Sequence, residues 1–159
     1  MTLVKAQSWN GDHLGLGSEA CIHVAPPATD LSAISRTAGI AFHAVPGTKV
    51  TSKQTLMEQI SKSLHFPDWF GKNWDALADS LRDLSWVRSP GYLLVFQDSD
   101  VFARAAPKDF KTFVQVLGDV CRDWRQWEVP FHVVFVGPPE MAKVLAGATA
   151  APICLHEGE

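Results

Sequence analysis

The stretch FPDWFGKNWDALADSLRDLSW, residues 66–86, places three tryptophans among four aspartates in the most regular part of the chain. Asn73 is a favoured N-cap, because its side-chain oxygen can accept a hydrogen bond from a free N–H of the first helical turn. A helix is therefore predicted from about Asn73 to Leu84. At about 100° per residue, one arc of this helix is apolar: Trp74, Leu77, Leu81 and Leu84. The opposite arc carries carboxylates: Asp75, Asp79 and Asp83.

The acidic arc has two interpretations. Carboxylates four residues apart repel one another by a few tenths of a kcal/mol, and only Asp75 is favoured by the positive end of the helix dipole. A solvated outer face accounts for this pattern. However, Trp69 and Phe70 lie in the loop that enters the helix, and exposed aromatic side chains beside charges are typical of protein interfaces. The residue pattern alone leaves both interpretations open, and the two aromatics could also be buried.

Apolar runs and helical periodicities alternate along the rest of the chain. Strands are predicted at 40–47, 92–98 and 131–137, with weaker candidates at 3–9 and 20–26. Helices are predicted at 30–39 and 51–66, in the region after residue 98, from Pro107 onward, and at 138–147, before a polar tail. Strands joined by helices favour an α/β fold with a small parallel sheet.

Composition limits the class of protein. The chain has 159 residues, of which 47% are hydrophobic, which suits one globular domain. A net charge of −3 with scattered Lys and Arg argues against nucleic-acid binding. Three distant cysteines without a CxxC pattern are expected to be reduced thiols. No apolar run approaches the roughly 18 residues of a membrane span, and no secretory leader is evident, so a cytoplasmic location is expected.

Motifs of catalytic or metal sites are lacking in the sequence. No HExxH, GxSxG, P-loop or dinucleotide-binding pattern accompanies the aspartates. The six histidines do not fall at ligand spacing, and His43 and His132 lie in apolar strand candidates, where hydrogen-bonded core histidines are expected. We therefore predict a protein that is not an enzyme and has neither a metal site nor a cofactor.

The run from Pro67 to Leu77, PDWFGKNWDAL, resembles the barstar family, whose members are intracellular ribonuclease inhibitors. That family's hallmark is a Pro-acid-aromatic-aromatic-Gly-x-Asn-x-Asp-Ala-Leu run across the binding loop and the start of the second helix. The resemblance implies a three-stranded parallel sheet packed by helices. It extends over a domain at 39–137, leaving an N-terminal extension at 1–38 and a C-terminal helix and tail at 138–159.

The resemblance also implies a function. Asp79 matches the aspartate that enters the nuclease active site, and Asp75 and Trp69 match residues that support it. The implied partner-binding residues are Asp68, Trp69, Phe70, Gly71, Lys72, Asn73, Asp75 and Asp79. The implied partner is a secreted basic ribonuclease or another toxin, for which this chain would be the immunity protein. The alternative is a regulatory or scaffold protein with the same fold and a different partner.

Overall fold

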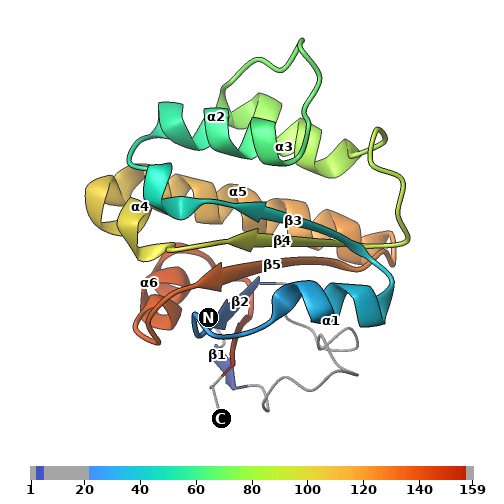
Figure 1. The fold of residues 1–159 in the computed structure, drawn as a ribbon. Helices are drawn as coiled ribbons and strands as arrows, with labels where there is room; N and C mark the ends of the chain where they lie inside the picture. The colour runs from blue at the N-terminus through green and yellow to red at the C-terminus, as the bar shows by residue number, and fades with distance from the viewer. Residues whose placement is uncertain (1–2, 6–21, 157–159) are drawn as a thin grey trace.

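The computed structural model describes residues 3–5 and 22–156. Its centre is a sheet in which all neighbouring strands are parallel and follow the order β1-β6-β2-β5-β4-β3 (Figure 1). The strands are β1 Leu3–Lys5, β2 Ile22–Ala25, β3 Ala41–Val45, β4 Tyr92–Phe96, β5 Phe131–Val136 and β6 Ile153–Leu155. Among the described residues, no helix is both long enough and apolar enough to cross a membrane.

The helices begin and end where local chemistry dictates. They are α1 Leu31–Ala38, α2 Lys53–Ser63, α3 Trp74–Asp83, α4 Asp100–Ala105, α5 Pro107–Gln126 and α6 Met141–Ala148, with a short 3₁₀ turn, η1, at Gly47–Lys49. Ser52 and Thr55 form a reciprocal capping box at the start of α2. Gly39 ends α1 in the left-handed conformation, and Pro107 occupies the first turn of α5. The six α-helices of the described residues form in the regions predicted from sequence, and α6 ends one residue later than predicted, at Ala148.

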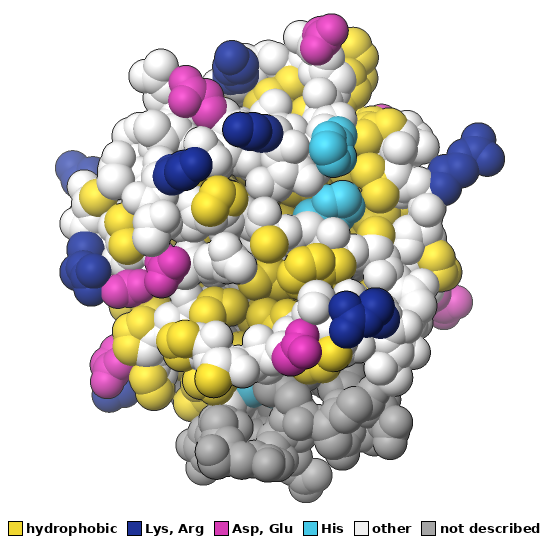
Figure 2. Space-filling model, viewed as in Figure 1, with side chains coloured by type: hydrophobic (Ala, Val, Ile, Leu, Met, Phe, Trp, Pro, Cys, Tyr) yellow, Lys and Arg dark blue, Asp and Glu magenta, His cyan; other side chains and the backbone are white. Residues whose placement is uncertain are grey.

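The two faces of the sheet are covered unequally. The main core lies on one face, where α5 packs on β5 and lies between α3 and the sheet (Figure 1). On the other face α1 packs on β3 over a smaller apolar cluster, formed by Ala25, Leu31, Ile34, Leu93, Val95 and Val134. Figure 2, in the view of Figure 1, shows hydrophobic side chains gathered near the centre of the visible surface. Helix α2, which precedes the 66–86 stretch, and helix α3, which lies within it, contribute to the main core.

The prediction of a three-stranded sheet was wrong. β3, β4 and β5 form where expected, but β2 pairs with β5, β6 pairs with β2, and β1 pairs with β6, giving six strands among the described residues. The end of the chain was predicted as a polar tail, because the three residues of β6 carry too little periodicity to indicate a strand. The part of the predicted 3–9 strand beyond Lys5 lies outside the described residues.

One cysteine prediction was also wrong. Cys121, on the buried side of α5, is disulfide-bonded rather than reduced. Cys154 of β6 is a buried thiol. The wide sequence separation of the three cysteines therefore did not reveal which of them would be oxidised.

Candidate protein-binding surface

The loop that enters α3 is anchored in the core by two phenylalanines. Phe66 and Phe70 are 8% and 7% exposed, and their rings meet edge to face with centroids 4.8 Å apart. The backbone N–H of Phe70 donates to the carbonyl of Pro67 at 3.0 Å, which closes the turn between the two rings. Trp86 packs against Phe66 and donates its Nε1–H to the carbonyl of Leu64 at 2.9 Å. The loop is therefore fixed from inside.

The same turn directs Trp69 outward. With Phe70 turned into the core, the Trp69 indole is 72% exposed, the largest exposed fraction of any large hydrophobic side chain among the described residues. Asp68 beside it is also exposed. Holding a tryptophan in water forgoes the free energy that burial would provide, about 25 cal/mol per Å² of apolar area. An exposed indole on a fixed turn is a feature of protein-binding surfaces.

Residues 71–73 set the start of α3. Asn73 accepts a hydrogen bond from the backbone N–H of Ala76 at 2.8 Å through Oδ1. Its Nδ2 donates to the carbonyl of Gly71 at 3.3 Å. Lys72 adopts a positive φ of 53°, a left-handed conformation that costs free energy in a residue with a Cβ. The N-cap predicted from sequence is confirmed, and Lys72 beside it is exposed.

Helix α3 presents its two arcs as predicted. Leu77 and Leu81 are fully buried, and Leu84 is 1% exposed. Trp74 is only partly buried, and the ammonium group of Lys53 lies 5.5 Å from its ring centroid, a cation–π distance. The exposed arc consists of Asp75, Asp79 and Asp83.

The Asp79 carboxylate is left largely uncompensated. Arg82 Nε donates to Asp123 of α5 at 2.6 Å, whereas the closest approach of its guanidinium to Asp79 is 3.9 Å. The Asp79 side chain is 82% exposed, and a surface pair of this length contributes little. Trp124 of α5 adds a second tie, because its Nε1–H donates to the carbonyl of Leu81 at 2.8 Å. Asp79 therefore projects into water from a helix that is fastened to the domain.

The sum of charges on this surface is negative. The exposed groups of residues 68–83 include four carboxylates, Asp68, Asp75, Asp79 and Asp83, and one ammonium group, that of Lys72. Arg82 is paired with Asp123, so we assign it to that pair. Four negative charges and one positive charge leave a net of about −3 on the loop and the outer arc of α3. We name these residues, together with Trp69, the acidic surface.

One protein family matches the part of the chain that carries the acidic surface. The family described as Barstar (barnase inhibitor) matches residues 40–136, which run from the start of β3 to the end of β5 and include the acidic surface. The chain belongs to the barstar family. Barstar homology thus covers β3, β4 and β5 with the helices between them, whereas β1, β2, β6, α1 and α6 lie outside the match. No curated protein matches the chain. The barstar description names an inhibitor, and hence a protein partner.

The predicted partner-binding residues divide into two groups. Those with exposed positions are Asp68, Trp69, Gly71, Lys72, Asn73, Asp75 and Asp79. Phe70, in contrast, lies in the core, so its side chain supports the loop from below. Asn73 acts in part through the cap that it gives to α3. The role of the exposed residues in binding a partner stays a prediction.

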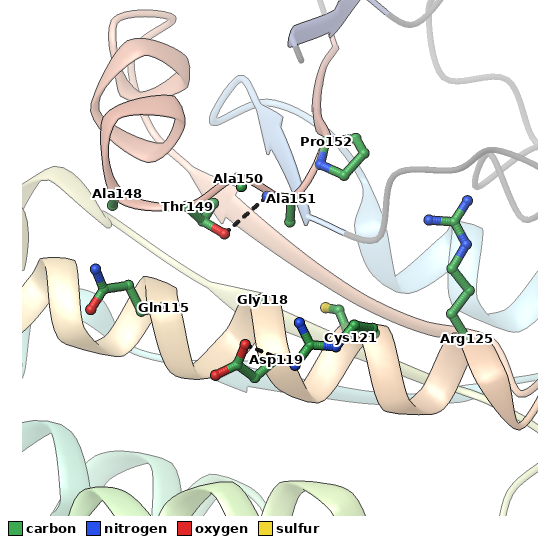
Figure 3. A pocket seen from close by; sticks show the side chains of 11 residues that line it. Gln115, Gly118, Asp119, Cys121, Arg125, Ala148, Thr149, Ala150, Ala151 and Pro152 are labelled. Carbon is green, nitrogen blue, oxygen red and sulfur yellow. Dashed lines mark hydrogen bonds and ion pairs between the residues drawn. The ribbon is translucent and has the colours of Figure 1, made fainter. Parts of the chain in front are cut away.

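A separate cavity of about 670 Å³ lies between α5 and the segment 148–152 (Figure 3). Its polar groups satisfy one another locally: Arg122 donates to Asp119 at 3.1 Å, and Thr149 Oγ1 accepts from the backbone N–H of Ala151 at 3.1 Å. Figure 3 shows Arg125 standing apart from them. Because the charged groups do not converge on one point, the lining of this cavity does not resemble a set of catalytic residues.

Sequence reasoning missed a buried group of polar side chains. His23, His132 and His156 are joined by hydrogen bonds although 109 and 133 residues separate the bonded pairs, and Cys154 lies beside them. His132 was predicted to be a hydrogen-bonded core residue, and this is confirmed. No sequence signal of fixed spacing could have revealed the group, because the pairing of β2 with β5 and β6 creates it.

Proposed function

We propose that this protein is a non-catalytic inhibitor that binds a basic ribonuclease or a similar toxin and covers its active site with the acidic surface. The observation that carries the proposal is the exposure of Asp79, 82% of whose side chain faces water on a helix tied to α5. A secreted toxin as the target and the cytoplasm as the place of action are parts of the same proposal.

The chemistry of the target explains why a carboxylate suits it. A nuclease must offer a cationic cleft to the phosphates of its substrate, and charge-assisted hydrogen bonds to Arg and His are strong. A carboxylate on a rigid helix can occupy that cleft with little loss of conformational freedom on binding. The net negative charge of the acidic surface would also speed the encounter with a basic partner. Asp79 is the group that we assign to the cleft, with Asp75 one turn before it.

The neighbouring residues have separate roles in the proposal. Trp69 would provide apolar contact area beside the carboxylates, since tryptophan is enriched among residues that dominate binding energy. Phe70 and Asn73 would act by holding the loop and the start of α3 in the binding geometry. Lys72 would meet an acidic residue at the rim of the partner, because a cation facing a basic cleft would repel it.

The test uses one variant that is expected to lose binding and one matched control variant. Secreted basic proteins of the native host are passed over the immobilised chain, and the bound fraction is assayed for hydrolysis of RNA. The wild type and Glu140→Ala should retain this activity, because Glu140 is an exposed carboxylate at the start of α6, outside the acidic surface. Asp79→Ala should lose at least about a hundredfold in affinity, a magnitude typical of charged hot spots, for which barnase and its inhibitor are the reference case.

Two results would overturn the proposal. A bound fraction without any nuclease or toxin activity would favour the alternative of a regulatory or scaffold protein. Retention that is insensitive to Asp79→Ala would show that the acidic surface is not the binding site. All three proteins are compared by circular dichroism beforehand, so that a folding defect is not mistaken for lost binding.

A further inference from the structure

Three histidines and a cysteine meet in the core on the α1 side of the sheet, opposite α3. His23 is in β2, and its register neighbours are Val134 of β5 and Cys154 of β6. Alternate residues of a strand point to the same face, so His132 shares the face of Val134 and His156 shares the face of Cys154. Val134 belongs to the apolar cluster under α1. The parallel register therefore assembles these side chains on one patch of the sheet.

The four side chains are close together and buried. His23 Nδ1 lies 2.9 Å from His156 Nε2, and His23 Nε2 lies 2.9 Å from His132 Nδ1. The nitrogen, sulfur and nitrogen atoms of His23, Cys154 and His156 that could hold a metal all lie within 4.8 Å of one another. These three residues are 0%, 2% and 4% exposed. The backbone N–H of His156 donates to the carbonyl of Val24 at 2.8 Å, which fixes its position after β6.

We propose that His23, Cys154 and His156 bind a zinc ion, and that His132 orients His23 for this role. Imidazole nitrogen and thiolate sulfur are the ligands that zinc prefers, at about 2.0–2.1 Å and 2.3 Å respectively. The three residues supply three of the four ligands of a tetrahedral site. Two nitrogens on one tetrahedral zinc lie about 3.3 Å apart, so the 2.9 Å separation of His23 Nδ1 and His156 Nε2 has to widen by only a few tenths of an ångström.

The hydrogen bond to His132 fits a ligand histidine. A zinc-bound imidazole almost always donates its other ring N–H to an acceptor, which fixes its tautomer and orientation. With the metal on His23 Nδ1, the proton is on Nε2 and is donated to His132 Nδ1.

The protons balance on binding. The Cys154 thiol loses its proton to solvent when its sulfur takes the metal, so one proton is released per zinc. The proton shared between His23 Nδ1 and His156 Nε2 moves to His156 Nδ1, which leaves Nε2 free to coordinate. No oxidant or reductant takes part.

A purely structural hydrogen-bonded chain of histidines is the competing explanation. A zinc site requires a thiolate or further ligand beside the ring nitrogens, and Cys154 lies directly across from His23 in the β2–β6 register. A thiolate is the ligand that most favours zinc over magnesium or calcium. The site lies on the opposite face of the sheet from the acidic surface, so its failure would leave the proposed inhibitor function unaffected.

The experiment titrates the metal-free full chain with zinc against a chromophoric chelator, and repeats the titration with cobalt(II) as a spectroscopic probe. We expect one equivalent of zinc to bind, and cobalt to give the thiolate charge-transfer band and the visible bands of a tetrahedral site. Cys154→Ser should abolish the charge-transfer band, and His156→Gln should weaken binding by at least about a hundredfold. His132→Phe should weaken it by about 10–100-fold, as for other residues that orient a ligand. His65→Gln, an exposed histidine outside the cluster, should match the wild type.

Three outcomes would overturn the proposal: no equivalent of zinc bound by the wild type, cobalt spectra without a thiolate band, or a band that survives Cys154→Ser. The wild-type titration decides the first two without any variant. Circular dichroism and urea midpoints of the metal-free variants show which of them fold. If Cys154→Ser does not fold, His156→Gln gives the decisive comparison, because this residue follows the last strand and its backbone hydrogen bond does not depend on its side chain.

Discussion

Two adjacent aromatic residues of the binding loop should respond to truncation in opposite ways. Phe70 is 7% exposed and meets Phe66 edge to face at 4.8 Å, whereas Trp69 is 72% exposed. Burying a phenylalanine contributes about 1.5–3 kcal/mol, and an edge-to-face pair adds about 0.5–1.5 kcal/mol. Phe70→Ala should therefore lower the free energy of unfolding by about 3 kcal/mol, at the lower end of the Phe→Ala range because the site is near the surface. Trp69→Ala should change it by less than about 0.5 kcal/mol.

Urea unfolding followed by circular dichroism measures both variants, with equal m-values as the check that the unfolded states are alike. In a thermal scan, the Phe70→Ala loss corresponds to a fall in Tm of roughly 10 °C for a chain of this size. Phe70→Leu serves as the matched control and should lose less, because it keeps most of the apolar volume. A loss below about 1 kcal/mol for Phe70→Ala, or an equal loss for Trp69→Ala, would refute the assignment of Phe70 to the core and Trp69 to the surface.

Four further outcomes are expected. Asn73→Ala should lower the free energy of unfolding by about 1 kcal/mol in urea titrations, because it removes the N-cap of α3, whereas Asn73→Ser should retain most of it. Gly47→Ala should lower the free energy of unfolding by more than about 3 kcal/mol, since the added Cβ would lie 1.6 Å from a backbone carbonyl oxygen just after β4. As its control, Gly147→Ala should leave stability unchanged or raise it, because no atom lies within 4 Å of the added Cβ. Burial and, to a lesser extent, nearby His65 hold the pKa of His43 below 6.5. The unfolded chain therefore binds this proton at a higher pH than the folded chain does, so the free energy of unfolding should fall as pH drops below about 6.5. An NMR titration should place the His43 midpoint under that value, and a midpoint at or above it would contradict the reasoning. If the acidic surface steers a basic partner, the association rate measured by stopped flow should fall as salt rises above about 0.1 M, and a rate independent of salt would exclude steering.

Local chemistry predicted most elements of this protein. The Asn73 cap and the apolar arc of α3 depend on residues within one or two helical turns, so the sequence contains all the information needed to place them. The same holds for Gly39 at the end of α1 and for Pro107 at the start of α5. The PDWFGKNWDAL run likewise identified the family. Its residues are contiguous and form one loop and one helix start, so the pattern that marks the family can be read from a short stretch of sequence.

Only the tertiary structure decided which side chains of that run face water. The sequence does not distinguish which of the adjacent aromatics Trp69 and Phe70 is buried. The turn that begins at Pro67 places Phe70 in the core and Trp69 in water. The number of strands was likewise undetermined, since the three residues of β6 form a strand only because β1 and β2 pair with it on either side. The meeting of His23, His132, Cys154 and His156 has the same origin. Strand register brings together residues more than a hundred positions apart, and no local periodicity encodes that register.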